Sequence, residues 1–167
     1  MRLEKPLAPG STIGILGGGQ LGRMLALAAG ELGFSCHIFA PEADSPAFQV
    51  SGAHTVAGYH DFTALEGFAK SVAVVTYEFE NVPGDTAAFL ESRVALAPSS
   101  GALKTAQDRV DEKTFIAGLG IPVAPFAAVN GQPELEAAIA LIGRPSVLKT
   151  RRFGYDGKGQ TKITEKT

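Results

Sequence analysis

The glycine-rich stretch at residues 17–22 constrains the fold more than any other part of the chain. It reads Gly-Gly-Gly-Gln-Leu-Gly and directly follows the short apolar run Thr12–Leu16. Apolar residues then recur at helical spacing as far as Leu32, and Gly33 stands where a helix C-cap belongs. A buried strand, a tight glycine turn and an amphipathic helix in this order predict the first strand–helix unit of a parallel sheet.

The same alternation continues along the first hundred residues. Residues 35–39, 72–76 and 94–97 are rich in β-branched and apolar side chains and predict strands. Residues 61–71 and 83–92 predict helices, the first of them with Asp61 as its N-cap. We therefore predict an α/β fold, a doubly wound parallel sheet of Rossmann-like type over residues 1–98.

A second domain is predicted to begin after Pro98 and to occupy residues 99–167. Its pattern is helical at 99–119 and at 133–141, and strands are predicted at 126–129 and 146–150.

Composition narrows the class of function. The formal net charge of −2 gives no reason to expect nucleic acid or an anionic membrane as partner. The single cysteine, Cys36, excludes an intrachain disulfide, and no apolar run approaches the length of a membrane span or a signal peptide. We expect a soluble cytoplasmic protein. The segment from Lys149 onward carries six basic against two acidic residues, so an anionic ligand would be drawn to it.

Three functions are open to the glycine turn on the residues alone. Backbone N–H groups in such a turn, at the positive end of a helix, favour a phosphate or another anion, which is the interpretation we prefer. A dinucleotide site is disfavoured, because Ala40 stands where an acidic residue should hold the ribose and Glu42 follows too late. A purely structural turn is the third possibility.

Two carboxylates follow the most hydrophobic predicted strand. If that strand continues beyond Thr76, its period of two places Glu78 and Glu80 on one face, at the edge where open α/β sheets bind ligands. The alternative is a pair of solvated strand-end charges.

A glycine loop at residues 154–160 follows Lys149, which leaves a predicted strand. Three glycines among cations can fold their N–H groups over a polyphosphate, although the spacing is not that of a Walker loop and a plain hairpin turn is the alternative. Arg151, Arg152 and Lys158 should repel one another without an anion, so we expect the ligand-free loop to be poorly ordered.

Arg109, in the run Gln107-Asp108-Arg109, would by itself be read as an exposed helix charge. The histidines share no metal-ligand spacing.

Taken together, these motifs resemble the 5-(carboxyamino)imidazole ribonucleotide synthase family of ATP-grasp ligases in purine biosynthesis. The resemblance runs from about Gly14 to Gln160. It implies a pre-ATP-grasp domain followed by the beginning of an ATP-grasp domain. It also implies a reaction in which ATP phosphorylates bicarbonate, and carboxyphosphate or its carbon dioxide carboxylates 5-aminoimidazole ribonucleotide. The motifs that carry it are Gly17-Gly18-Gly19-Gln20-Leu21-Gly22-Arg23-Met24, Tyr77-Glu78-Phe79-Glu80-Asn81-Val82-Pro83, Gln107-Asp108-Arg109 and Gly154-Tyr155-Asp156-Gly157-Lys158-Gly159-Gln160.

The resemblance also implies roles for individual residues. ATP would be bound by Arg109, Lys149, Gly154, Tyr155, Asp156, Gly157, Lys158, Gly159 and Gln160, with Lys158 as the catalytic residue. The aminoimidazole ribonucleotide would be bordered by Gln20, Leu21, Glu80, Tyr155 and Lys158.

Family members are considerably longer than this chain and pair as homodimers. The resemblance therefore implies that the magnesium ligands and the adenine hinge lie beyond residue 167, and that this chain alone is inactive. Another ATP-grasp enzyme, such as formate-dependent glycinamide ribonucleotide transformylase, and a non-catalytic nucleotide-binding or dimerisation module are the alternatives.

Overall fold

The computed structural model describes residues 5–154 and 156–165. The chain forms two compact units, Met1–Lys104 and Thr105–Thr167. The division falls after the junction predicted near Pro98, because Leu103 is buried in the core of the first unit.

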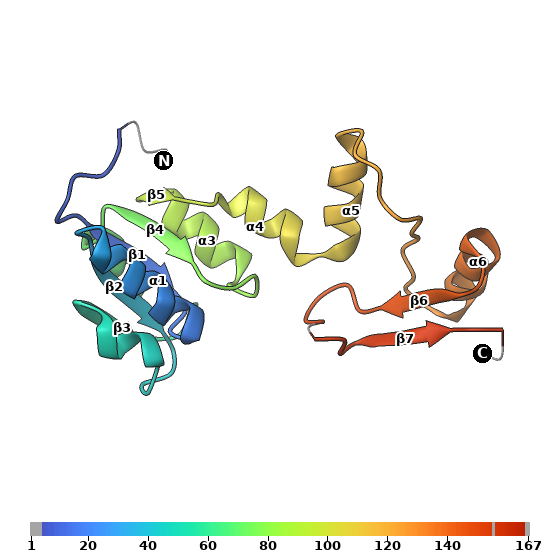
Figure 1. The fold of residues 1–167 in the computed structure, drawn as a ribbon, viewed down its shortest axis with the longest axis horizontal. Helices are drawn as coiled ribbons and strands as arrows, with labels where there is room; N and C mark the ends of the chain where they lie inside the picture. The colour runs from blue at the N-terminus through green and yellow to red at the C-terminus, as the bar shows by residue number, and fades with distance from the viewer. Residues whose placement is uncertain (1–4, 155, 166–167) are drawn as a thin grey trace. The chain divides into compact units, whose positions relative to one another are not determined.

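A single parallel sheet organises the first unit (Figure 1). Its strand order is β3-β2-β1-β4-β5, and every neighbouring pair is parallel. Strands added on both sides of β1 confirm the predicted doubly wound topology. The strands are β1 (Thr12–Leu16), β2 (Ser35–Ala40), β3 (Ala53–Val56), β4 (Val74–Tyr77) and β5 (Ala95–Leu96).

Helices cover both faces of this sheet because both faces of its central strands are apolar. Successive side chains of a strand point to opposite faces. Ile15 accordingly packs with Ala26 of helix α1 (Gln20–Glu31) and Ala47 of the 3₁₀ helix η1 (Pro46–Val50). On the other face, Leu16 belongs to a cluster that includes Phe68 and Leu90, from helices α2 (Phe62–Lys70) and α3 (Gly84–Glu91).

Local signals at helix ends have the predicted effect. Asp61 caps α2, and its side chain accepts a hydrogen bond from the backbone N–H of Ala64 at 2.9 Å. Gly33 follows the end of α1 with a positive φ of 80°. Cys36 is a buried free thiol, as expected of a small core residue.

The structure departs from the pattern of the sequence at several elements. Strand β4 ends at Tyr77, so the condition under which Glu78 and Glu80 would share one face of a strand is not met. The helical region 99–119 divides at Asp108 into α4 (Ser100–Gln107) and α5 (Arg109–Gly118), because Asp108 adopts an extended backbone and caps α5. Strand β3 and the helix η1 were not predicted at all.

The second unit contains α5, α6 (Gln132–Ile142) and an antiparallel hairpin of β6 (Ser146–Lys149) and β7 (Gln160–Ile163). The strand predicted at residues 126–129 was wrong: in the described part of the chain these residues pair with no strand. A short apolar run alone does not make a strand, because strand formation depends on packing against neighbouring strands. Nowhere in the described residues is a helix long and apolar enough to cross a lipid bilayer.

Candidate functional site

The carboxyl ends of β1 and β4 mark the point where the strand order of the first sheet reverses. Leu16 and Tyr77, the last residues of these strands, are direct partners in the parallel register. In open α/β sheets, ligands bind in the crevice outside such a switch point. The glycine turn leaves β1 at this edge, and Glu78 leaves β4 beside it.

Glu78 contacts the glycine turn directly. The backbone N–H of Gly19 donates to Oε1 of Glu78 at 3.0 Å. The side chain lies so close that a Cβ on Gly17 would stand 2.3 Å from Cγ of Glu78. Gly19 is also the N-cap residue of α1, where the helix dipole favours negative charge. The Glu78 carboxylate therefore accepts a hydrogen bond from one of the N–H groups that were predicted to bind an external anion. Phosphate binding at this turn remains a prediction.

The residues predicted to border the aminoimidazole ribonucleotide occupy exposed positions near this edge. Gln20 and Leu21 open helix α1, and their side chains are exposed. Glu80 is exposed in the turn after β4, and it is Glu78 that contacts the glycine turn. Tyr155, also predicted to border this ligand, lies outside the described residues.

Tyr59 is a candidate that the sequence reasoning missed. Burial, followed by the charges of Glu42 and Glu78, raises the pKa of the Tyr59 phenol. The phenol therefore stays protonated at neutral pH and can donate a hydrogen bond near the two carboxylates. Tyr59 comes shortly after β3, and because that strand went unpredicted, no sequence signal placed the residue at this edge.

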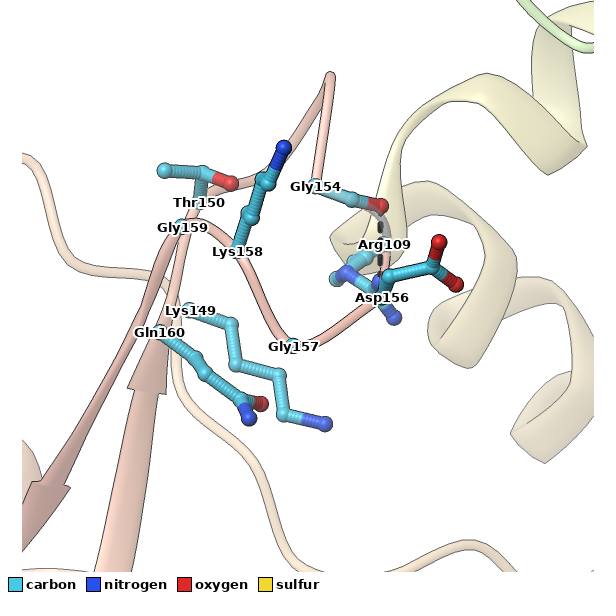
Figure 2. A pocket seen from close by; sticks show the side chains of 9 residues that line it. All are labelled: Arg109, Lys149, Thr150, Gly154, Asp156, Gly157, Lys158, Gly159 and Gln160. Atoms are coloured by element: carbon cyan, nitrogen blue, oxygen red, sulfur yellow. Dashed lines mark hydrogen bonds between the residues drawn. The ribbon is translucent and has the colours of Figure 1, made fainter.

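The second unit contains a cavity of about 200 Å³ at the loop end of the β6–β7 hairpin (Figure 2). Three cationic side chains and one carboxylate lie around it, which gives the described lining a net positive charge. The cavity brings together eight of the nine residues predicted to bind ATP and adds Thr150. Its described lining is Arg109, Lys149, Thr150, Gly154, Asp156, Gly157, Lys158, Gly159 and Gln160.

The hairpin fixes how the cations of the loop are presented. Lys149 and Gln160 form its last strand pair, and their side chains extend side by side in Figure 2, whereas Lys158 points away from them. The backbone N–H of Thr150 then donates to the carbonyl of Gly159 at 2.8 Å and closes the base of the loop. Cations on two sides of a glycine loop suit an elongated anion such as a polyphosphate.

Arg109 joins this cavity from a different element. It is the first residue of α5, and its Nη2 lies 3.5 Å from the carbonyl oxygen of Gly154 (Figure 2). The residue pattern alone gave little reason to choose Arg109 over other exposed charges. Its place at the cavity follows from the helix break at Asp108.

The two units match two family models in succession. Residues 10–107 match the ribonucleotide synthetase preATP-grasp domain, and residues 114–167 match the ATP-grasp domain. A doubly wound sheet followed by a cation-lined glycine hairpin is thus the start of an ATP-grasp protein. The chain belongs to the ribonucleotide synthetase preATP-grasp family, and it is similar to the N-terminal part of N5-carboxyaminoimidazole ribonucleotide synthases.

Curated and solved relatives agree on this resemblance. The N5-carboxyaminoimidazole ribonucleotide synthase of Brucella melitensis is 48% identical over 157 residues, which are 94% of this chain and 43% of the relative. A crystal structure of an N5-carboxyaminoimidazole ribonucleotide synthetase with ADP is 44% identical with a TM-score of 0.92, covering 98% of this chain and 43% of that one. The Aspergillus clavatus synthase with ADP and 5-aminoimidazole ribonucleotide is 30% identical with a TM-score of 0.82, covering 94% and 41%. The chain therefore spans less than half the length of these relatives.

Proposed function

We propose that residues 1–167 supply the N-terminal part of an N5-carboxyaminoimidazole ribonucleotide synthase. In the reaction proposed for the whole synthase, ATP phosphorylates bicarbonate. The resulting carboxyphosphate, or carbon dioxide released from it, then carboxylates the exocyclic amine of 5-aminoimidazole ribonucleotide. ADP and phosphate are released. The observation that carries the proposal is the cavity that Arg109, Lys149 and Lys158 line together with one glycine loop.

The roles of these cations follow from the charge of the reacting group. Phosphoryl transfer is catalysed mainly by positioning and by neutralising charge on the transferred group. Arg109 and Lys149 are proposed to contact the phosphates of ATP. Lys158, on the loop itself, is proposed as the catalytic residue beside the transferred phosphoryl group. The loop N–H groups would supply further donors.

The first unit is proposed to bind 5-aminoimidazole ribonucleotide at the switch point, bordered by Gln20, Leu21 and Glu80. The support is the position of β1 and β4, whose carboxyl ends carry these residues. Glu78 and the protonated phenol of Tyr59 would lie next to that ligand.

Magnesium, the homodimer and the cytoplasmic location stay predictions. Among residues 5–154 and 156–165, no three His, Cys, Asp or Glu side chains form a group able to hold a metal ion. No step of the proposal depends on a magnesium ligand within these described residues.

The test is ADP release by the whole protein containing these residues, measured with and without 5-aminoimidazole ribonucleotide and bicarbonate. Arg109→Ala and Lys149→Ala should each weaken the use of ATP about 10- to 150-fold, because each removes a charge-assisted phosphate contact. Lys162→Ala, an exposed cation on β7 outside the cavity, is the matched control and should behave as wild type. A rate of ADP release that is the same with and without 5-aminoimidazole ribonucleotide would refute the proposal.

A titration with NAD beside one with 5-aminoimidazole ribonucleotide separates the proposed substrate from a dinucleotide. Binding of NAD alone would favour the nucleotide-binding module instead.

A further inference from the structure

The Asp108 side chain contacts two segments of the second unit, the first turn of α5 and Arg151 after β6. As the N-cap of α5, its Oδ1 accepts from the backbone N–H of Val110 at 2.9 Å and from that of Asp111 at 3.4 Å. The same carboxylate accepts from Nε of Arg151 at 3.0 and 2.8 Å and from its Nη2 at 2.8 Å. The Asp108 side chain is only 16% exposed, and such forked contacts to a carboxylate fix geometry as well as charge.

The backbone continues this connection into the cavity. The N–H of Arg109 donates to the carbonyl oxygen of Arg151 at 3.1 Å, so the residue after Asp108 is tied to the residue that Asp108 holds. By contrast, among the described residues the Arg109 guanidinium makes a long contact, 3.5 Å from Nη2 to the carbonyl oxygen of Gly154. The backbone of Arg109 is therefore anchored, while its charged end makes a weak contact with the described part of the loop that an anion could replace.

Neither Asp108 nor Arg151 belongs to the described lining of the cavity. Their charges compensate each other at the side of it. The hydrogen bond from Arg151 is the main reason that the pKa of Asp108 is lowered, so the carboxylate stays ionised at neutral pH. Arg151 is thus engaged by a carboxylate, whereas Arg109, Lys149 and Lys158 face the cavity.

We propose that Asp108 and Arg151 are positioning residues, which clasp the start of α5 to the segment that leads from β6 into the glycine loop and thereby hold Arg109 at the phosphate cavity. The proposal rests on the proposed function insofar as the bound anion is the polyphosphate of ATP. Without the clasp, the backbone hydrogen bond between Arg109 and Arg151 would lose its side-chain support, and Arg109 would be held less firmly at the cavity.

The variant that isolates the clasp is Asp108→Asn. Asparagine is as good an N-cap as aspartate, so α5 keeps its cap while the charged fork to Arg151 is lost. In the whole protein we expect the KM for ATP to rise on the order of tenfold, as the loss of an orienting partner does at metal sites, with a smaller change in kcat. Arg151→Gln should have the same effect, and Arg151→Lys should recover part of it.

A double variant and a neighbouring control sharpen the test. In the double variant Asp108→Asn with Arg151→Gln, the KM for ATP should rise no further than in either single variant, because both changes remove the same contact. Arg152→Gln removes the adjacent exposed cation, which stacks near Phe153 and contacts neither partner in any described interaction, and it should match wild type. An unchanged KM for ATP in both single variants, or losses that multiply in the double variant, would overturn the clasp.

The 167-residue chain offers a readout that does not depend on the synthase reaction. Inorganic tripolyphosphate can be titrated into it while the backbone amide signal of Arg109 is followed by NMR. Asp108→Asn should weaken this binding about tenfold relative to Arg152→Gln. Equal affinity in the two variants, or no binding by the wild-type chain, would overturn the clasp even if the enzyme activity is confirmed. Weakened binding without any synthase activity would keep the clasp and refute only the proposed reaction.

Discussion

Replacing Gly22 with alanine tests how tightly the glycine turn is built against helix α1. Gly22 is buried within α1, and a Cβ placed on it would stand 2.6 Å from the carbonyl oxygen of Gly17. That oxygen cannot withdraw easily, since the N–H of the same residue donates to the carbonyl of Phe39 at 3.0 Å. The added methyl group must therefore displace backbone rather than a flexible side chain.

The magnitude follows from two opposing terms. Alanine in a helix is favoured over glycine by about 1 kcal/mol, and overpacking a rigid site costs typically about 1 to 3 kcal/mol. With backbone as the obstacle, the upper end applies, so Gly22→Ala should lower the free energy of unfolding by about 2 kcal/mol. Gly30→Ala lies in the same helix, where a Cβ meets open space, and should instead raise it by about 0.5 to 1 kcal/mol.

Urea unfolding followed by far-ultraviolet circular dichroism gives the two free energies. Hydrogen exchange at the amide of Ile15, in the core of the first unit, shows whether the change in unfolding free energy belongs to that unit. If Gly22→Ala proves as stable as Gly30→Ala, the turn and helix are not in the close contact described, and the reasoning fails.

Three further outcomes are expected. Asp61→Ala should cost about 1 kcal/mol in unfolding free energy by removing the hydrogen bond to the Ala64 amide, and Asp61→Asn should cost much less. Because the hydrogen bond from Arg151 lowers the pKa of Asp108, its stabilising contribution is present at neutral pH and is lost as the pH falls below about 4. The difference in thermal midpoint between wild type and Asp108→Asn should therefore shrink in acid, and a constant difference would contradict the pairing. Trypsin should cut the ligand-free chain after Arg152 before it cuts after Arg151, which mass spectrometry of early fragments can show.

The sequence was most informative where local chemistry decides the structure. The strand before the glycine turn, the Asp61 cap and the strand that ends near Lys149 each depend on neighbouring residues, and each was predicted correctly. Strand β3 escaped prediction because it lies at the sheet edge, is only four residues long and has a mostly exposed pattern.

The site details that escaped prediction depend on contacts between distant residues. Glu78 and Glu80 are indistinguishable by spacing, and only the end of β4 at Tyr77 allows Glu78 to reach Gly19. Arg151 looked like one of several repelling loop cations. Its partner Asp108 comes 43 positions earlier, a separation that no local pattern reveals.

The pairing of β1 with β4 has a consequence for how the chain reaches its folded state. Gly19 and Glu78 are 59 positions apart, and β2, β3 and α2 lie between them in the chain. Closing so long a loop is entropically costly, and parallel pairings of this kind are slow compared with hairpins. The carboxylate therefore reaches the turn only after the central sheet has assembled, so protection of the Gly19 amide during refolding should appear late and report that the switch point has formed.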